Sequence, residues 1–447
     1  MSLAAPTTRT DLARRFAEVR AFTESLCDGL ATEDYVVQSM EDVSPTKWHL
    51  AHTTWFWETF VLTPYAEGYA LHDERYPYLF NSYYVQAGER HCRAQRGYLS
   101  RPTVEEVFAY RHHVDAAMAR FLDDLDEAER PDVADVVEVG LHHEQQHQEL
   151  MLTDLKHVFA VNPLRPAFRE RPAAPTVDPG PVGWRRFGAG LHEVGFRSED
   201  EATTRGRFHF DNEGPRHRQY VEAFELADRL VTCGEYLDFM ADGGYERAPL
   251  WLSLGWATRQ ERGWTEPFYW EQRDGGTGDG PEWWHYTLAG MRPVDPNEPV
   301  THLSYFEADA FARWAGARLP SEFEWEVAAR TVWDGAGEAP GSFADAGRLH
   351  PAPAAPVGGD GAPADVPALR QMFGEVWQWT HSQYGPYPGY RPVEGALGEY
   401  NGKFMANQFV LRGGSVATSR SHIRPTYRNF FPPDATWQFT GLRLARS

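Results

Sequence analysis

The spacing of apolar residues changes near residue 165, and this change constrains the possible folds more than any other feature of the chain. Before it, apolar side chains recur at helical spacing in four stretches. These stretches are Thr8–Leu30, a segment that follows Ser44 and Pro45 and runs to Phe60, Thr103–Leu125, and Pro131–Val158. The sequence therefore predicts an N-terminal four-helix bundle, a fold whose core commonly holds metal ligands.

Residues 162 to 182 are rich in Pro, Arg and Ala and lack periodicity, which is typical of a linker. Beyond them Gly, Trp and Pro become frequent, and short alternating segments such as Gln219–Leu226 predict strands. This half is expected to be mixed α+β. We place the bundle at 1–165, the linker at 166–182 and the second domain at 183–447.

Two helices are predicted in the second domain. One spans Tyr305–Ala315 and the other Ser321–Arg330. In the second, Ser321 is followed three residues later by Glu324, which is the spacing of a capping box at a helix N-terminus.

Net charge and composition exclude some classes of binding partner. A net charge of -21 repels phosphate backbones and anionic lipid, so nucleic acid and membranes are poor candidates and a small zwitterionic ligand fits better. The chain has no long apolar run and starts without the apolar core of a signal peptide, so we expect a cytoplasmic protein. Its three cysteines are far apart, which indicates neither a disulfide framework nor a thiolate zinc site.

The sharpest chemical signal is the run HHEQQHQE at residues 142–149. His143 and His147 are one helical turn apart, so both imidazoles can reach one ion. Solvent-facing or core histidines are the plain alternative. The pattern also fits a zinc hydrolase with Glu144 as general base, although His157 follows without the glycine turn typical of many such enzymes.

A third ligand can come from the second predicted helix, where His49 and His52 lie among several tryptophans. An imidazole on such an aromatic face needs a partner, and a metal ion would supply one. Three neutral imidazoles leave open positions on an octahedral ion for a substrate nitrogen, a substrate sulfur and O2.

Paired tyrosines and arginines follow in the run from Asn81 to Arg96. Arg93 and Arg96 could clamp a carboxylate, while the phenol of Tyr83 or Tyr84 supplies a proton or hydrogen atom. A solvated basic surface with packed aromatic rings is the alternative interpretation.

Together these segments resemble the sulfoxide synthases of ergothioneine biosynthesis, over nearly the whole chain. The first half resembles their DinB-like four-helix bundle through SPTKWHLAHTTWFWE and HHEQQHQE. That resemblance implies Fe(II) as the cofactor, with His52, His143 and His147 as its ligands.

The second half resembles the formylglycine-generating-enzyme and C-type-lectin-like domain. The matching segments are FDNEGPRH, PVTHLSYFEADAFARWAGARLPSEFEWEVAAR, GEVWQWT and RGGS. True formylglycine-generating enzymes carry a cysteine pair that this half lacks, since Cys233 is alone there, so their thiol-based copper chemistry is not implied.

Within the family, FNSYYVQAGERHCRAQRGYLSRP resembles the branch that takes free cysteine. The resemblance implies that Tyr84 is the active-site tyrosine, with Tyr83 beside it, and that Arg93 and Arg96 hold the cysteine carboxylate. The branch that takes γ-glutamylcysteine has its tyrosine on the second domain, where Tyr384 and Tyr387 are the candidates.

Near the C-terminus, YRNFFPPDATWQFTGLR resembles the segment that cradles the histidine betaine hercynine. The resemblance implies that Asn429 hydrogen-bonds the betaine, that Phe430 and Phe431 face its quaternary ammonium, and that Gln146 contributes from the bundle. Ordinary core packing is the alternative for these phenylalanines. The site is then expected between the two halves.

The resemblance implies an O2-dependent oxidoreductase that joins cysteine to hercynine and yields a sulfoxide. Coupling of cysteine to histidine itself, as in ovothiol formation, remains an alternative, as does the use of γ-glutamylcysteine. The other open alternatives are the zinc hydrolase and a metal-free binding module.

Overall fold

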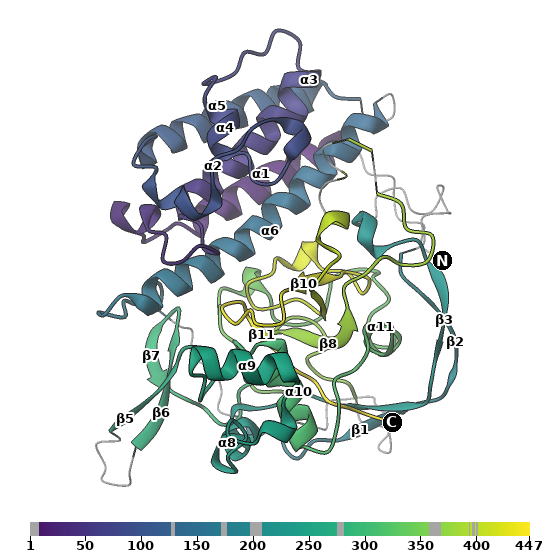
Figure 1. Ribbon diagram of the computed structural model, residues 1–447. Helices are drawn as coiled ribbons and strands as arrows, with labels where there is room; N and C mark the ends of the chain where they lie inside the picture. Colours follow the sequence, from purple (N-terminus) through teal and green to yellow (C-terminus); the bar gives the residue numbers. More distant parts are fainter. Residues whose placement is uncertain are drawn as a thin grey trace. The chain divides into compact units, whose positions relative to one another are not determined.

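The computed structural model describes residues 9–126, 130–170, 177–196, 208–274, 281–356, 368–392, 394–395, 398 and 401–447. The chain forms two compact units (Figure 1). Unit 1 comprises Met1–Val161 with described parts of Ser198–His209 and Arg391–Gly402, and unit 2 comprises Asn162–Arg197, Phe210–Tyr390 and Lys403–Ser447. The domain boundaries expected from the sequence, 1–165, 166–182 and 183–447, stay a prediction. Each unit of the structure also includes segments that are distant in the chain.

Unit 1 is helical, and four of its helices form the expected bundle. They are α1 (Arg9–Ser25), α2 (Thr46–Trp57), α5 (Val104–Asp124) and α6 (Pro131–Val161). The shorter elements are η1 (Thr32–Val36), α3 (Thr63–Tyr65), α4 (Tyr76–Phe80), η3 (Val85–Ala87) and η4 (Arg93–Tyr98). The long connection between α2 and α5 holds most of these short elements.

Helix α2 is the central element of the bundle. Every residue from Thr46 to Trp57 is buried, and the helix packs against both α5 and α6. At Glu58 it continues into η2, a π-helical turn over Glu58–Leu62. Such turns are uncommon and often lie beside functional sites, because the extra residue redirects the side chains that follow.

Unit 2 is mixed α+β, as expected. Its helices are α8 (Cys233–Ala241), α9 (Ser253–Arg262), α10 (Tyr305–Trp314) and α11 (Glu322–Ala329), with short turns η5 (Asp211–Glu213), η6 (Ala248–Leu250), η7 (Ala344–Ala346), η9 (Gly402–Phe404) and η10 (Arg420–His422). The capping box predicted for α11 is confirmed, because the Ser321 side chain accepts from the Glu324 amide and the Glu324 carboxylate accepts from the Ser321 amide.

Within the described residues, the strands of unit 2 form four small sheets. The strands are β1 (Trp184–Phe187), β2 (Gly190–Val194), β3 (His217–Val221), β4 (Phe224–Ala227), β5 (Trp270–Asp274), β6 (Pro281–Thr287), β7 (Gly290–Pro293), β8 (Trp377–Gln383), β9 (Phe409–Arg412), β10 (Asn429–Phe431), β11 (Thr440–Gly441) and β12 (Ala445–Arg446). The sheet orders are β1-β4-β12, β10-β9-β8-β11, β2-β3 and β5-β6-β7.

The single strand predicted at 219–226 is wrong. The chain leaves the strand conformation at Glu222 and Ala223, so β3 pairs with β2 whereas β4 pairs with β1 and β12 in another sheet. The buried apolar positions change phase at this break, from Val221 to Phe224 and Leu226, and the prediction of one strand overlooked that shift. Among the described helices, none is long and apolar enough to cross a membrane.

Candidate metal centre

Three histidines of unit 1 meet in the core of the bundle. His52 comes from α2, and His143 and His147 lie one turn apart on α6. Their ring centroids are 4.6 to 5.0 Å apart, and one ligand nitrogen from each lies within 4.8 Å of the others. The Nε2 atoms of His52 and His143 are 3.2 Å apart, close to the separation of neighbouring ligands on one ion.

The ring of His52 is fixed on all sides. Its Nδ1 lies 2.5 Å from the carbonyl oxygen of Phe80 and donates to it, which leaves the lone pair on Nε2. The Trp48 ring stacks on the His52 ring with centroids 4.6 Å apart, and the Trp55 ring stacks on it with centroids 5.3 Å apart. The imidazole therefore presents one nitrogen to the cluster in one orientation.

Burial keeps the three imidazoles neutral. It lowers the pKa of His143 to about 3, and it lowers the pKa values of His52 and His147 well below the usual range, with further lowering by the neighbouring histidines. Neutral imidazole is the form that binds a metal ion. Three such nitrogens converging in a dry core fit a divalent transition metal, and His52, His143 and His147 would hold it.

His147 contacts His49, the other histidine that the sequence offered as a possible third ligand. Its Nδ1 lies 2.8 Å from Nδ1 of His49, and Nε2 of His49 lies 2.9 Å from Oδ2 of Asp154 on α6. The same carboxylate oxygen accepts from the Ser44 amide at 2.8 Å. These contacts join the His147 ring to the buried carboxylate of Asp154 through His49.

Glu144, the general base of the hydrolase alternative, is used elsewhere. Its carboxylate is fully buried and bonds to the guanidinium groups of Arg20 at 3.0 Å and Arg111 at 2.9 Å. It also accepts from Thr23 at 2.7 Å and Trp57 at 2.9 Å. Both oxygens are committed to structural donors, so this geometry does not favour a water-activating role.

Tyr84 lies beside the histidine cluster within an aromatic enclosure. Its ring is fully buried, 6.4 Å from the His143 ring and 5.3 Å from that of Phe60 on η2. Asn81 holds the loop, because its amide donates to the carbonyls of Tyr84 and Gly88 and accepts from the Tyr84 amide. Tyr83 stacks on Tyr84 at 4.6 Å and is only partly buried.

The two predicted carboxylate-binding arginines have different environments. Arg96 is buried, its guanidinium lies 3.3 Å from the centre of a Trp48 ring, and it donates to the hydroxyls of Ser44 and Ser82. No described residue accepts from its Nε, and burial lowers its pKa well below the usual range. Arg93 is exposed and donates to the backbone carbonyl of Asp42 at 2.6 Å.

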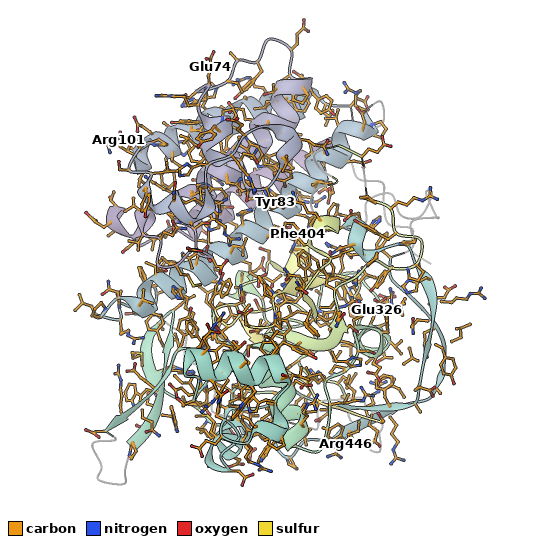
Figure 2. All side chains as sticks on the ribbon, in the orientation of Figure 1. Glu74, Tyr83, Arg101, Glu326, Phe404 and Arg446 are labelled. Atoms are coloured by element: carbon orange, nitrogen blue, oxygen red, sulfur yellow. The ribbon has the colours of Figure 1, made fainter. Side chains whose placement is uncertain are left out.

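Among the other predicted residues, Gln146 lies on α6 between His143 and His147 and is partly buried. Asn429, Phe430 and Phe431 form β10 in unit 2 and are likewise partly buried. Phe430 stacks on Tyr384 at 4.0 Å and lies 5.8 Å from the ring of Phe404. Figure 2 shows Tyr83 among the elements of unit 1 and Phe404 among those of unit 2.

The two candidate tyrosines of unit 2 are both buried and hydrogen-bonded. The hydroxyl of Tyr384 accepts from the Asn212 side chain at 2.9 Å, and that of Tyr387 donates to Glu322 at 3.0 Å. Tyr387 also accepts from Arg412 at 2.9 Å. These bonds give both tyrosines a role in the structure of unit 2.

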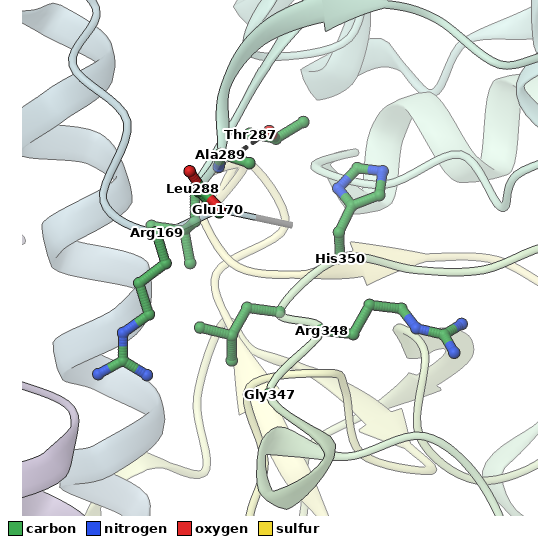
Figure 3. A pocket seen from close by; sticks show the side chains of 9 residues that line it. Arg169, Glu170, Thr287, Leu288, Ala289, Gly347, Arg348 and His350 are labelled. Atoms are coloured by element: carbon green, nitrogen blue, oxygen red, sulfur yellow. Dashed lines mark hydrogen bonds between the residues drawn. The ribbon is translucent and has the colours of Figure 1, made fainter. Parts of the chain in front are cut away.

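Unit 2 holds a second histidine cluster, formed by His285, Glu298 and His350. Arg292 fills its centre, donating to Glu298 and, from Nε at 2.9 Å, to Nε2 of His285, while its Nη2 lies 3.2 Å from Nε2 of His350. The guanidinium supplies the positive charge that a metal would bring. His350 also lines a small pocket with the loop at 287–289 (Figure 3).

Two family models match the chain, one for each half. The model of the DinB superfamily matches residues 15–151, and that of the sulfatase-modifying factor enzyme 1-like domain matches residues 188–447. These matches confirm the fold class expected from the sequence.

Curated relatives match over most of the chain. The hercynine oxygenase of Mycolicibacterium thermoresistibile is 33% identical and covers 98% of this chain and 95% of its own length. That of Mycobacterium tuberculosis is 36% identical, over 68% of this chain and 70% of its own. Among solved structures, PvdO from Pseudomonas aeruginosa covers 61% of this chain and 99% of its own, with a TM-score of 0.36 at 20% identity.

Proposed function

Because this chain belongs to the hercynine oxygenase family, we propose that it is a non-heme iron enzyme that uses O2 to join L-cysteine to hercynine. The chain is an oxidoreductase, and the product would be hercynylcysteine sulfoxide. The balance is simple: a thiol hydrogen and a ring hydrogen are lost, one oxygen atom enters the sulfoxide, and the other leaves as water.

The observation that carries the proposal is the cluster of His52, His143 and His147. Its three neutral imidazoles converge from two helices with one ligand nitrogen each within 4.8 Å of the others. A bound Fe(II) ion would supply the redox chemistry that activates O2 and would lower the pKa of a coordinated thiol. With three protein ligands from the described residues, the ion would keep open positions that both substrates and O2 could reach.

Tyr84 is the residue best placed to handle a proton at this centre. Its phenol is enclosed by aromatic rings, including those of Trp55 and Phe60, which exclude water from it. The Asn81 clamp holds the loop that carries it. We assign Tyr84 as the proton or hydrogen-atom donor, with Tyr83 as its stacked neighbour, so that sulfur is coupled to the ring rather than oxidised alone.

Cysteine is the thiol donor that Arg96 supports. Among the described residues, this buried guanidinium has no acceptor at Nε and no carboxylate bonded to it, so a substrate carboxylate would satisfy it. Arg96 and His52 both contact the Trp48 ring, which places the guanidinium one indole away from the cluster. Arg93, on the same turn, would add a second positive charge.

For the betaine, we propose contacts from Asn429, Phe430, Phe431 and Gln146. A quaternary ammonium is attracted to aromatic faces. Because Tyr384 already covers one face of Phe430 at 4.0 Å, Phe431 has the freer ring for this contact.

The test is O2 consumption by anaerobically purified, Fe(II)-loaded protein given hercynine with either cysteine or γ-glutamylcysteine, with products identified by mass. We expect O2 uptake only with hercynine and cysteine, and a product mass equal to both substrates plus one oxygen minus two hydrogens. His143→Ala should abolish uptake. His142→Gln is the matched control, since His142 instead stacks on Phe208 at 4.0 Å.

Other outcomes would redirect the assignment. Uptake with γ-glutamylcysteine alone would move the chain to the other branch of the family, and uptake with histidine in place of hercynine would favour ovothiol-type coupling. Absence of uptake with every pair would overturn the proposal.

A further inference from the structure

We propose that His49 and Asp154 are positioning residues that fix the tautomer and ring orientation of His147, and so set the metal affinity of the cluster. This inference rests on the proposed metal site at His52, His143 and His147. It assigns a role to two buried side chains that touch neither the ion nor a substrate.

The direction of each hydrogen bond follows from the chemistry of Asp154. A carboxylate only accepts, so Nε2 of His49, 2.9 Å from Oδ2 of Asp154, must carry a hydrogen. With that hydrogen as the only one on the His49 ring, its Nδ1 is an acceptor. Because Nδ1 of His147 lies 2.8 Å from it, the hydrogen between them belongs to His147.

The consequence for His147 is a fixed tautomer. With its hydrogen on Nδ1, the lone pair is on Nε2, the nitrogen left to face the cluster. The opposite arrangement, with a hydrogen on Nδ1 of His49, would place the hydrogen of His147 on Nε2 and block metal binding. Asp154 therefore selects the metal-binding tautomer across two rings.

The chain of contacts is also held rigidly. His49 is 2% exposed and Asp154 is 4% exposed, and the Ser44 amide donates to the same Oδ2 at 2.8 Å. Two of the three proposed ligands differ in what orients them. His52 donates to a backbone carbonyl, whereas His147 depends on side chains that substitution can alter.

The experiment measures Co(II) binding to the full chain by calorimetry and by the visible absorption of the bound ion. Wild type should bind one Co(II) that His143→Ala abolishes. Asp154→Asn should weaken the affinity roughly 10- to 100-fold and alter the absorption bands, because the amide no longer requires the N–H of His49. His49→Phe should do the same, and His49→Gln, which keeps an acceptor, should recover part of the loss.

His157→Gln is the matched control, since His157 is buried on the same helix and contacts Ser39. Its Co(II) affinity should equal that of wild type. Thermal unfolding of each variant without metal separates loss of affinity from loss of fold. In the double variant His49→Phe with Asp154→Asn, the loss of Co(II) affinity should match that of a single variant, because both substitutions interrupt the same series of hydrogen bonds.

The possible failures are distinguishable. If wild type bound no Co(II), or bound it without His143, the proposed metal site would itself be wrong. Wild-type affinity and spectrum in Asp154→Asn, with the site intact, would overturn the positioning role alone. Fully additive losses in the double variant would show that His49 and Asp154 act separately and would also overturn it.

Discussion

Tyr84 is buried among aromatic rings next to His143, whereas its stacked neighbour Tyr83 is partly exposed. Removing one hydroxyl at a time therefore separates their roles. Tyr84→Phe should raise the ratio of cysteine sulfinate to coupled sulfoxide, because the proposed proton donor is lost while the enclosure keeps its shape. Tyr83→Phe should leave the ratio near that of wild type. Product ratios by mass spectrometry decide this, and an unchanged ratio at full activity in Tyr84→Phe would contradict the assignment.

Glu144 supports the bundle through Arg20 and Arg111. Glu144→Gln should reduce the free energy of unfolding by about 1–3 kcal/mol, because two buried guanidinium groups each lose one carboxylate partner and keep only Asp115 or Glu24. The folded fraction should keep its oxygenase activity, whereas a hydrolase would lose its general base. Urea denaturation followed by circular dichroism measures the first effect. A variant as stable as wild type would show that the ion pairs contribute little.

The same carboxylate predicts a pH dependence. Burial alone would raise the pKa of Glu144, but Arg20 and Arg111 outweigh it and hold the pKa below 4.5, its ordinary value. A lowered pKa stabilises the fold above pH 4.5, and this contribution is lost as the pH falls below that value. Wild type should therefore lose stability below about pH 4.5 more steeply than Glu144→Gln. Parallel acid-unfolding curves for the two proteins would argue against this.

Residue-level prediction from the sequence succeeded where spacing carries information. The pair His143 and His147 follows from the helical repeat. The tryptophan-rich context offered His49 or His52 as the third member, and the family resemblance selected His52, which the fold brings to the pair. The partners His49 and Asp154 were not recognised together. They are 105 residues apart, and nothing in either local pattern indicates the other.

At the level of elements, the four bundle helices were predictable because each has a long apolar stripe, and their ends agree with the structure within a few residues at most positions. The π-helical turn η2 was not, since an insertion of one residue in the hydrogen-bonding pattern leaves apolar spacing nearly unchanged. The division between β3 and β4 was missed although the buried apolar positions change phase there, from Val221 to Phe224.

The capping box of α11 gives an element-level prediction. Ser321→Ala should lower the stability of unit 2 by about 1 kcal/mol, because the Glu324 amide loses its acceptor. Ser253→Ala is the control, since the N-terminus of α9 has no side-chain cap, and it should change stability by less than about 0.5 kcal/mol. Urea unfolding monitored by circular dichroism compares the two. Equal effects would mean that the cap contributes nothing specific.

For the whole molecule, the division into two units predicts which part of the chain a bound metal ion stabilises. A ligand present at 100 times its Kd stabilises the unit that binds it by about 2.7 kcal/mol. Hydrogen exchange with and without Co(II) should therefore show slower exchange in α2 and α6 of unit 1 and little change in β8 or α11 of unit 2. Uniform protection of both units would show that they open as one cooperative body.

The stacking of Trp48 and Trp55 on His52 also makes the cluster optically visible. An excited indole in contact with a ligand of a paramagnetic ion loses its emission by electron or energy transfer. Metal binding should therefore quench part of the protein's intrinsic tryptophan fluorescence. Replacing Trp48 and Trp55 in turn by phenylalanine would show which indole reports. The occupancy of the buried centre could then be followed during turnover without any added dye.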